Sequence, residues 1–240
     1  RAFLEHSLNL GADKIATGHY AQVLHRDGQD LLYKGLDNNK DQSYFLCRLQ
    51  QQQLAKTIFP LGEIAKPQVR QLATNAQLIT HDKKDSTGIC FIGERPFREF
   101  LSQYIPVQKG EIISTEHKHV GEHDGVYFYT LGQRQGLGIG GVKGASDEPW
   151  YVVAKDTEQN TLTVAQGHDN PLLFSRSLIA TNLHWISNIP PQTPFNCLAK
   201  TRYRQADQSC TIEELNSNTA TVSFTNPQRA VTPGQYVVFY

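Results

Sequence analysis

The sequence predicts an α/β layer followed by a small, mainly β central domain and a C-terminal β-barrel. Two observations carry this prediction. Helical apolar spacings and short strand-like runs alternate as far as about residue 92, which is typical of an α/β layer. From residue 93 onward the pattern changes to successive short strands separated by glycine turns, which favours β domains. The expected domains are therefore residues 1–92, 93–170 and 176–240.

In the first domain, helices are expected over residues 1–10, 40–54 and 67–76. Gly11 is a C-terminal signal for the first helix, and Pro67 begins the last, at a position where its missing N–H costs nothing. The expected inner face of that last helix carries Val69, Leu72 and Ala73.

Two short strands, residues 14–17 and 58–61, are expected in the same domain. Ligands bind at the carboxyl ends of strands in α/β layers. Gly18 and His19 lie just past the first strand, so this is where the sequence predicts a ligand site.

The second and third domains contain a short expected helix, residues 95–104, and then strands. In the second domain the strands are expected at residues 110–114, 126–131, 150–155 and 161–166, the last two joined as a hairpin. The third segment contains a proline-rich stretch, residues 189–194, and a turn at residues 232–234. Short strands with such turns favour a barrel or sandwich.

Composition restricts the classes of function. Lysine plus arginine and aspartate plus glutamate both number 23, so the net charge is zero and nucleic-acid binding requires a local basic patch. The four cysteines include no CxxC pair and are too sparse for a disulfide scaffold, which favours a reducing cytoplasm. No apolar run of about 18 residues predicts a membrane span.

Cys90 is the first candidate for chemistry. Gly88 and Gly93 allow tight bends around it, so the segment can present the thiol to a partner. The alternative is a buried cysteine packed among apolar neighbours, because free cysteine is among the most buried residue types. The sequence leaves both interpretations open, since a reactive thiol needs exposure and a lowered pKa.

Two further motifs have ordinary explanations. Residues 136–141 match the dinucleotide-binding pattern G-x-G-x-x-G, but no helical spacing follows, so a flexible loop beside a substrate is expected, with Gln133 and Arg134 as polar contacts. The imidazoles near residue 120, together with a carboxylate, are expected on an exposed hairpin, and no metal is predicted there; they are His117, His119, His123 and Asp124.

Residues 195–205 give the strongest local signal for nucleic acid. Read as one strand, their period of two places three cations on one face: Lys200, Arg202 and Arg204. The opposite face carries Phe195, Cys197 and Ala199. Beside Tyr203 this stripe suits phosphate contacts, and the alternative is a solvated strand face.

Residues 40–42 also allow two interpretations. They could begin a helix whose N-terminal backbone amides bind phosphate, or they could begin an ordinary capped helix.

Five blocks resemble the tRNA-specific 2-thiouridylase family (MnmA/TrmU), in the family's order: residues 16–21, 39–45, 85–94, 130–134 and 200–204. The resemblance implies a partial PP-loop ATPase layer of the adenine nucleotide α-hydrolase type. It also implies an enzyme that uses Mg-ATP as a substrate to adenylate the C2 oxygen of the wobble uridine. A cysteine persulfide then delivers sulfur to C2, and AMP is released.

The resemblance assigns roles residue by residue. Cys90 matches the persulfide-carrying cysteine and Gly18 matches a glycine of the ATP site. The positions that match tRNA contacts are His19, Lys40, Asp41, Gln42, Arg202, Tyr203 and Gln235. The implied partners are the anticodon arm of tRNA and a sulfur-relay donor protein, without a membrane and without a metal site.

The chain departs from the family pattern at its N-terminal end. The glycine- and serine-rich pyrophosphate loop and the first catalytic cysteine are not among these 240 residues, and the extreme C-terminus is also expected to be missing. The sequence therefore predicts a fragment with weak tRNA affinity and a modifiable Cys90 but no turnover. Two alternatives are a non-catalytic RNA-binding module and a cysteine hydrolase that pairs Cys90 with His19 or His81.

Overall fold

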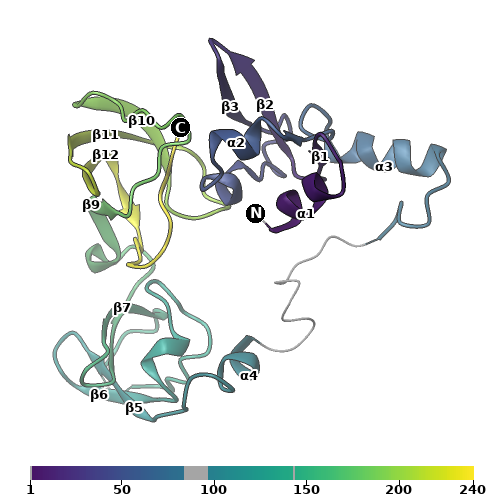
Figure 1. Cartoon of the computed structure of the whole chain (residues 1–240). Coiled ribbons are helices and arrows are strands. Elements are labelled where there is room, and N and C mark those ends of the chain that lie inside the picture. The colour runs from purple at the N-terminus through teal and green to yellow at the C-terminus, as the bar shows by residue number, and fades with distance from the viewer. Residues whose placement is uncertain (1, 84–96, 143) are drawn as a thin grey trace. The chain divides into compact units, whose positions relative to one another are not determined.

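The computed structural model describes residues 2–83, 97–142 and 144–240 (Figure 1). The chain divides into two compact units. The first unit holds Arg1–Lys84, Ile179–Ser223 and Tyr236–Tyr240, and the second holds Asp85–Leu178 and Phe224–Gln235. The first unit thus contains the N-terminal part, residues 2–83, together with much of a C-terminal sheet. The expected domain boundaries stay a prediction.

The N-terminal part combines short helices with two small sheets, as the α/β expectation requires. Its helices are α1 (Ala2–Asn9), the 3-10 helix η1 (Ser43–Leu46), α2 (Gln51–Leu54) and α3 (Lys66–Asn75). Strands β1 (Ile15–Ala16) and β4 (Thr57–Ile58) pair in parallel, with Ile15 opposite Thr57. This pairing confirms the strand expected at residues 14–17, whereas the second strand ends at Ile58 and the expected residues 59–61 lie outside it.

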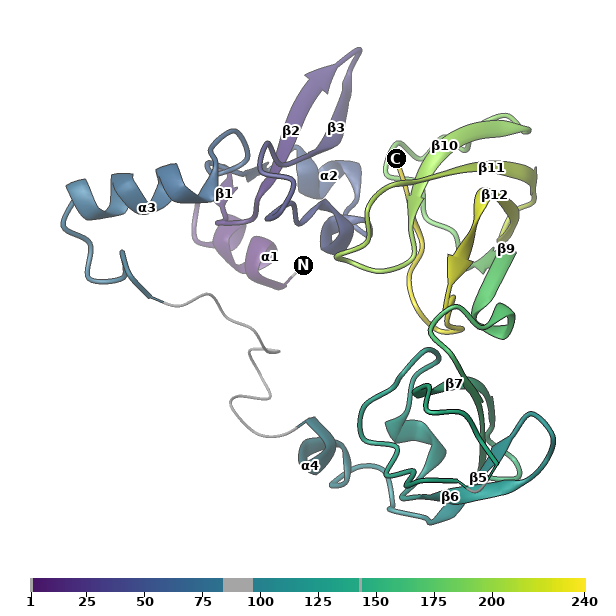
Figure 2. The same ribbon diagram turned by 180° about the vertical axis from the view of Figure 1, so that it is seen from behind.

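A hairpin that the sequence analysis did not predict joins β2 (Ala21–Arg26) to β3 (Gln29–Lys34). Its two-residue turn is Asp27-Gly28, and both residues have positive φ, 51° and 75°. A right-handed strand twist favours this kind of turn, and glycine is well suited to it. The hairpin extends away from the helices in both views (Figures 1 and 2).

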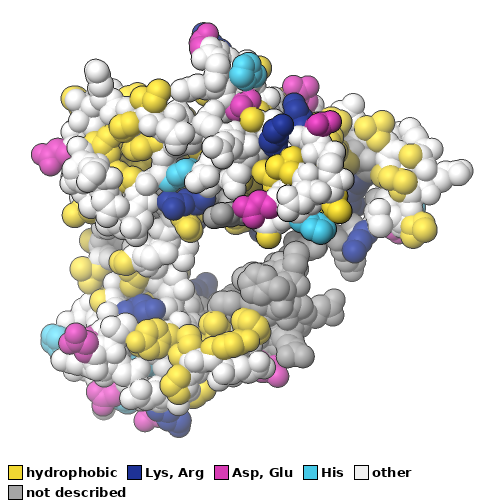
Figure 3. Space-filling view, viewed as in Figure 1, with side chains coloured by type: hydrophobic (Ala, Val, Ile, Leu, Met, Phe, Trp, Pro, Cys, Tyr) yellow, Lys and Arg dark blue, Asp and Glu magenta, His cyan; other side chains and the backbone are white. Residues whose placement is uncertain are grey.

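Two helix predictions need correction. Residues 40–54 do not form one helix, because a turn at residues 37–40 and the segment between η1 and α2 interrupt it. Helix α3 does begin around Pro67, but none of its residues is buried and Leu72 is 51% exposed. Figure 3 accordingly shows hydrophobic side chains on the surface of α3.

The second unit is built on a four-stranded sheet with the order β6-β5-β8-β7. The strands are β5 (Gly110–Ser114), β6 (His119–His123), β7 (Trp150–Asp156) and β8 (Thr161–Gln166), and helix α4 (Phe97–Leu101) precedes them. The β7–β8 hairpin confirms the predicted one. Apolar side chains of this sheet form a fully buried core that includes Ile112, Val152, Leu162 and Val164.

The strand predicted at residues 126–131 is wrong, because residues 126–128 form the 3-10 helix η2 (Val126–Phe128). Gly125 has φ 136°, which turns the chain before this helix. Val126 and Tyr129 then enter the same core from outside the sheet. Their apolar character therefore reflects core packing and not a place in a strand.

The C-terminal sheet has five strands in the order β13-β10-β11-β12-β9 and is curled as a half-barrel (Figure 1). The strands are β9 (Phe174–Thr181), β10 (Phe195–Lys200), β11 (Gln208–Leu215), β12 (Thr219–Arg229) and β13 (Val238–Phe239), and the 3-10 helix η3 (Pro171–Leu173) precedes them. This architecture confirms the expected C-terminal β domain. Among the helices that the structure describes, none is long and apolar enough to cross a membrane.

Candidate nucleic-acid interface

The turn that carries the predicted RNA contacts at residues 40–42 is fixed by Asp37. The Asp37 carboxylate accepts hydrogen bonds from the backbone N–H of Asn39 and of Lys66, both at 3.0 Å. The Asp37 carbonyl accepts from the N–H groups of Lys40 and Asp41, at 2.9 and 2.8 Å. Aspartate favours such local bonds over a helix, which explains why no helix begins at residue 40.

Asp41 lies inside the protein, with only 5% of the residue exposed. Its Oδ1 accepts from the N–H groups of Gly35 (3.0 Å) and Ser43 (3.1 Å), and its Oδ2 accepts from Ser43 Oγ at 3.0 Å. Gln42 similarly exchanges two hydrogen bonds with the backbone of Tyr20. Both side chains therefore hold the chain in place, and this geometry gives them positioning roles.

His19 and Gly18 follow β1, at the strand end where the sequence predicts a ligand. The Nδ1 atom of His19 is 2.7 Å from Thr17 Oγ1, and burial lowers the pKa of His19, so the ring is neutral at pH 7. Gly18 is exposed, and a Cβ there would meet Leu61 Cδ1 at an ordinary 3.9 Å. The space around position 18 does not itself require glycine, so its ATP role stays a prediction.

A charge cluster joins the N-terminal part to the C-terminal sheet. It consists of Lys34, Asp41, Lys200, Asp207 and Tyr240. Lys200 Nζ lies 3.7 Å from Asp41 Oδ2 and 3.6 Å from Asp207 Oδ1, and Lys34 forms an ion pair with Asp207. The Lys34 ammonium is also 4.0 Å from the centre of the Tyr240 ring. The Lys200 side chain is only 12% exposed, so its ammonium group is directed to these partners inside the protein and not to solvent.

The Tyr240 hydroxyl completes this cluster. It lies 3.1 Å from Ser43 Oγ. Since the Ser43 hydroxyl donates to Asp41, the Tyr240 hydroxyl acts as the donor to Ser43. Burial is the largest cause that raises the pKa of Tyr240, to about 12, which keeps the hydroxyl protonated.

Backbone carbonyls receive further bonds across the same junction. Tyr44 Oη donates to the Tyr236 carbonyl at 2.9 Å, and His184 Nε2 donates to the Leu49 carbonyl at the same distance. Gln51 Nε2 donates to the Ile186 carbonyl, also at 2.9 Å. The N-terminal part and the C-terminal sheet are thus joined by many directional contacts.

The predicted stripe of three cations on one strand face is wrong. Strand β10 ends at Lys200, and residues 201–204 form a bend and turn. Lys200 points to Asp41 and Asp207, whereas Arg202 and Arg204 are exposed. The basic character of the surface therefore comes from this turn.

The turn after β10 brings Tyr203 against the rings of η1. The ring centres of Tyr203 and Phe45 are 4.3 Å apart, and those of Tyr203 and Tyr44 are 6.2 Å apart. Burial and then the Asp41 carboxylate raise the pKa of Tyr203, while Arg204 and Lys40 are close enough to lower it. The loop that carries Lys40 and the turn that carries Tyr203, far apart in sequence, thus lie at one surface, whereas Asp41 is buried and holds its loop in place. Phe45 belongs to that surface, and sequence reasoning missed it because its apolar side chain matched the expected helix.

Two predicted residues remain, Gln235 and Cys90. Gln235 is exposed in the second unit, where its N–H donates to the Thr232 carbonyl at 3.2 Å. Cys90 lies outside the described residues, so its role and its pairing with His19 or His81 stay predictions.

Cys197 and Cys210 oppose each other on β10 and β11, with sulfur atoms 3.6 Å apart.

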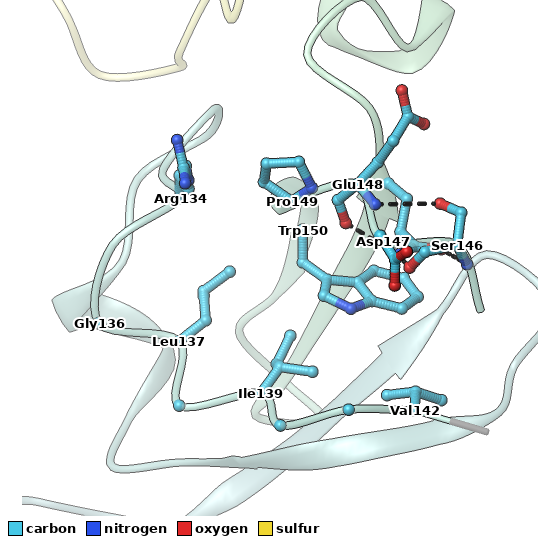
Figure 4. Close-up of a pocket in the computed structure, with 14 residues that line it drawn as sticks. Arg134, Gly136, Leu137, Ile139, Val142, Ser146, Asp147, Glu148, Pro149 and Trp150 are labelled. Carbon is cyan, nitrogen blue, oxygen red and sulfur yellow. Dashed lines mark hydrogen bonds between the residues drawn. The ribbon is translucent and has the colours of Figure 1, made fainter.

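The glycine-rich segment 136–141 lines a shallow hollow of about 420 Å³ in the second unit (Figure 4). In that view the Trp150 ring lies between Ile139 and Val142 on one side and residues 146–148 on the other, and Arg134 lies farther away. Residues 139–142 and 144–149 form no helix, which agrees with the rejection of a dinucleotide fold. Gln133 binds the backbone of its own loop, at Thr130 and Gln135, and does not point to a ligand.

The histidine cluster near residue 120 differs from the expected exposed hairpin at one position. His123 is 2% exposed, whereas His117 and His119 are exposed on the β5–β6 hairpin. The His123 ring accepts from Gly125 N–H at Nδ1 and lies 3.0 Å from the Asn160 carbonyl at Nε2. Within residues 2–83, 97–142 and 144–240, no group of three potential ligands could hold a metal ion.

Family models match the chain in three consecutive segments. A tRNA methyl transferase HUP domain matches residues 1–94, a tRNA methyl transferase PRC-barrel domain matches residues 98–166, and an aminomethyltransferase beta-barrel domain matches residues 175–240. The order is the one that the fold shows, with an α/β part followed by two β parts.

Relatives similar to this chain share one name, tRNA-specific 2-thiouridylase MnmA. The protein from Legionella pneumophila (strain Paris) is 55% identical over 239 residues, which cover 100% of this chain and 66% of the relative. The protein from Francisella tularensis subsp. tularensis (strain WY96-3418) is 57% identical over 241 residues, covering 100% and 67%. This chain thus spans about two thirds of their length. Together with the three family models, these identities show that the chain belongs to the tRNA-specific 2-thiouridylase MnmA family.

Proposed function

We propose that the full-length protein is a tRNA-uridine 2-sulfurtransferase and that this chain carries its RNA-binding surface and its persulfide cysteine, Cys90. ATP serves as the activating substrate, with magnesium: the C2 oxygen of the wobble uridine attacks the α-phosphate and pyrophosphate leaves. The terminal sulfur of the Cys90 persulfide then attacks C2 and displaces AMP, which leaves the base joined to Cys90 through an S–S bond. The thiolate of the family's first catalytic cysteine attacks Cys90 Sγ, so that this bond breaks, the two cysteines form a disulfide, and the 2-thiouridine is released. A donor protein in the cytoplasm supplies the sulfur.

The observation that carries this proposal is the convergence of two distant segments at one surface. Lys200 at the end of β10 pairs with Asp41, so residues 40–42 and the Arg202-Tyr203 turn are held together. Exposed cations beside aromatic rings suit a backbone with phosphates and unstacked bases. The chain as a whole has no net charge, so this local patch provides the positive charge that attracts RNA phosphates.

The comparisons carry two names for the chemistry, and the thiolation name is better supported. The first two family models are described by methyl transfer to tRNA, whereas the relatives are named thiouridylases. The relatives match across the whole chain at 55% and 57% identity, which is the more specific resemblance. Both names have tRNA as the substrate, so RNA binding does not depend on the choice between them.

ATP binding rests on fewer residues. Gly18 lies at the carboxyl end of β1, which is where ligands bind in parallel sheets. His19 beside it is neutral because of burial, so it suits a hydrogen bond better than an ion pair with phosphate. We therefore assign ATP to the full-length protein as its substrate and derive no step from these two residues.

A competition experiment tests the RNA specificity of this chain. Labelled tRNA is bound to the 240-residue chain and displaced by a hairpin copy of the anticodon arm or of the acceptor arm. The proposal expects the anticodon hairpin to compete about tenfold better or more, because single-stranded loops provide the unstacked bases. Equal competition by both hairpins would mean that the chain binds any polyanion and would contradict the proposal.

A further inference from the structure

We infer that Phe45 and Tyr203 together form a stacking platform for one unstacked base of the bound RNA. This inference rests on the proposed function, because it names how the same surface holds its RNA. Phe45 is not among the residues that the sequence predicts as RNA contacts. It comes from η1, and Tyr203 comes from the turn after β10, so the two parts of the first unit build the platform jointly.

The first step of the argument is exposure. Phe45 is 57% exposed, whereas its neighbour Tyr44 is 8% exposed and anchored through its hydroxyl to the Tyr236 carbonyl. The Tyr44 and Phe45 rings meet edge to face, with centres 5.7 Å apart and planes at 85°. Tyr44 therefore fixes the start of η1 from inside, and Phe45 is directed outward from a rigid base.

The second step is the arrangement of the rings. The Phe45 and Tyr203 ring centres are 4.3 Å apart, with planes inclined by 40°. An aromatic pair in contact is held in place with little loss of further side-chain freedom on binding. More than half of Phe45 remains available to a planar partner. Base–aromatic stacking uses this kind of exposed, preorganised ring.

The third step is charge. Arg202 and Arg204 flank Tyr203 on the exposed turn, and Lys40 stands close enough to act on the Tyr203 hydroxyl. Asp41 has the largest charge effect on this hydroxyl and raises its pKa, but its carboxylate is buried and paired with Lys200. The exposed charges beside the ring pair are thus the cations Arg202 and Arg204, which favours an RNA backbone over an apolar protein segment.

Binding of anticodon-arm RNA to the 240-residue chain tests the platform, with fluorescent 2-aminopurine replacing one loop base at a time. Phe45→Leu keeps an apolar side chain against Tyr203 but removes the aromatic face, and Phe45→Tyr restores it. We expect Phe45→Leu to weaken binding by about 5- to 100-fold, and Phe45→Tyr to bind within about threefold of the parent. The slope of affinity against salt should be unchanged, since no phosphate contact is lost.

The fluorescence series locates the base. Stacking on an aromatic ring quenches 2-aminopurine, so one loop position should be quenched by the parent and by Phe45→Tyr but not by Phe45→Leu. Tyr33→Ala is the matched control, because Tyr33 is 45% exposed on the β2–β3 hairpin. Its affinity and quenching should equal those of the parent. Thermal unfolding of each variant verifies that it is folded.

Three outcomes separate the inference from the function on which it rests. Equal RNA affinity for the parent and Phe45→Leu, with measurable binding, would overturn the platform and leave the exposed ring to a protein partner. Quenching at no loop position would also overturn it. No RNA binding by the parent would instead overturn the proposed function, because it concerns the whole surface and not this ring.

Discussion

The four-stranded sheet of the second unit and the charge cluster of the first unit are stabilised in opposite ways. The sheet borders an apolar core in which Val126, Val152, Leu162 and Val164 are fully buried. The charge cluster instead buries Asp41 and most of Lys200 and satisfies them with hydrogen bonds and ion pairs. The comparison shows that the apolar region provides stability, whereas the polar region fixes the position of the loop at residues 40–42 against the end of β10.

The largest effect is expected in the apolar region. Leu162→Ala removes buried methyl groups from a filled core and should lower the free energy of unfolding by about 2–5 kcal/mol. Urea unfolding followed by tryptophan fluorescence measures this loss, since Trp150 packs against the same core. Leu172→Ala is the control, because Leu172 is 60% exposed and should change stability by less than about 0.5 kcal/mol. Similar losses of unfolding free energy for Leu162→Ala and Leu172→Ala would contradict the view that the apolar core provides the stability.

A smaller loss is expected from the charge cluster. Lys200→Met leaves the buried Asp41 carboxylate with its three hydrogen bonds but without a cation, which should cost about 1–3 kcal/mol. The exposed Lys118→Met is the matched control. A double-mutant cycle with Asp41→Asn should give a coupling of about 0.5–3 kcal/mol. Strict additivity of the two substitutions would show that the pair does not join the two parts.

His123 sharpens the comparison, since it is a titratable group beside the apolar core. Burial lowers the pKa of His123, and its bond to Asn160 offsets only part of this. The unfolded chain therefore binds more protons than the folded one, and stability is lost as pH falls below about 6.5. As the pH is lowered from about 6.5, the midpoint temperature of thermal unfolding should fall less for His123→Gln than for the parent. Parallel pH profiles for the two proteins would contradict this role.

Regular local patterns made part of the fold predictable. The β7–β8 hairpin was predicted because two apolar runs flank a polar turn at residues 156–160. The β2–β3 hairpin was missed because its strands carry polar and charged residues such as Gln22 and Arg26. The helix at residues 40–54 was wrong because aspartate side chains bind nearby backbone N–H groups, which apolar spacing does not reveal.

The candidate site was predictable in composition but not in geometry. The basic turn at Arg202 stands out in the sequence, and the structure places it beside residues 40–42. The inward direction of Lys200 depends on Asp41, which lies far away in sequence, so no local pattern could show it. The exposure of Phe45 is similar, because it depends on Tyr44 being anchored by the distant Tyr236 carbonyl.

Salt-dependent tRNA binding by the parent and by Arg202→Ala tests the central claim, that this surface binds RNA phosphates. Lys118→Ala, an exposed lysine on the β5–β6 hairpin, provides the control. The account predicts that Arg202→Ala weakens binding at every salt concentration and reduces the salt slope by about one, while Lys118→Ala changes neither. An unchanged slope for Arg202→Ala, or no tRNA binding by the parent, would contradict it.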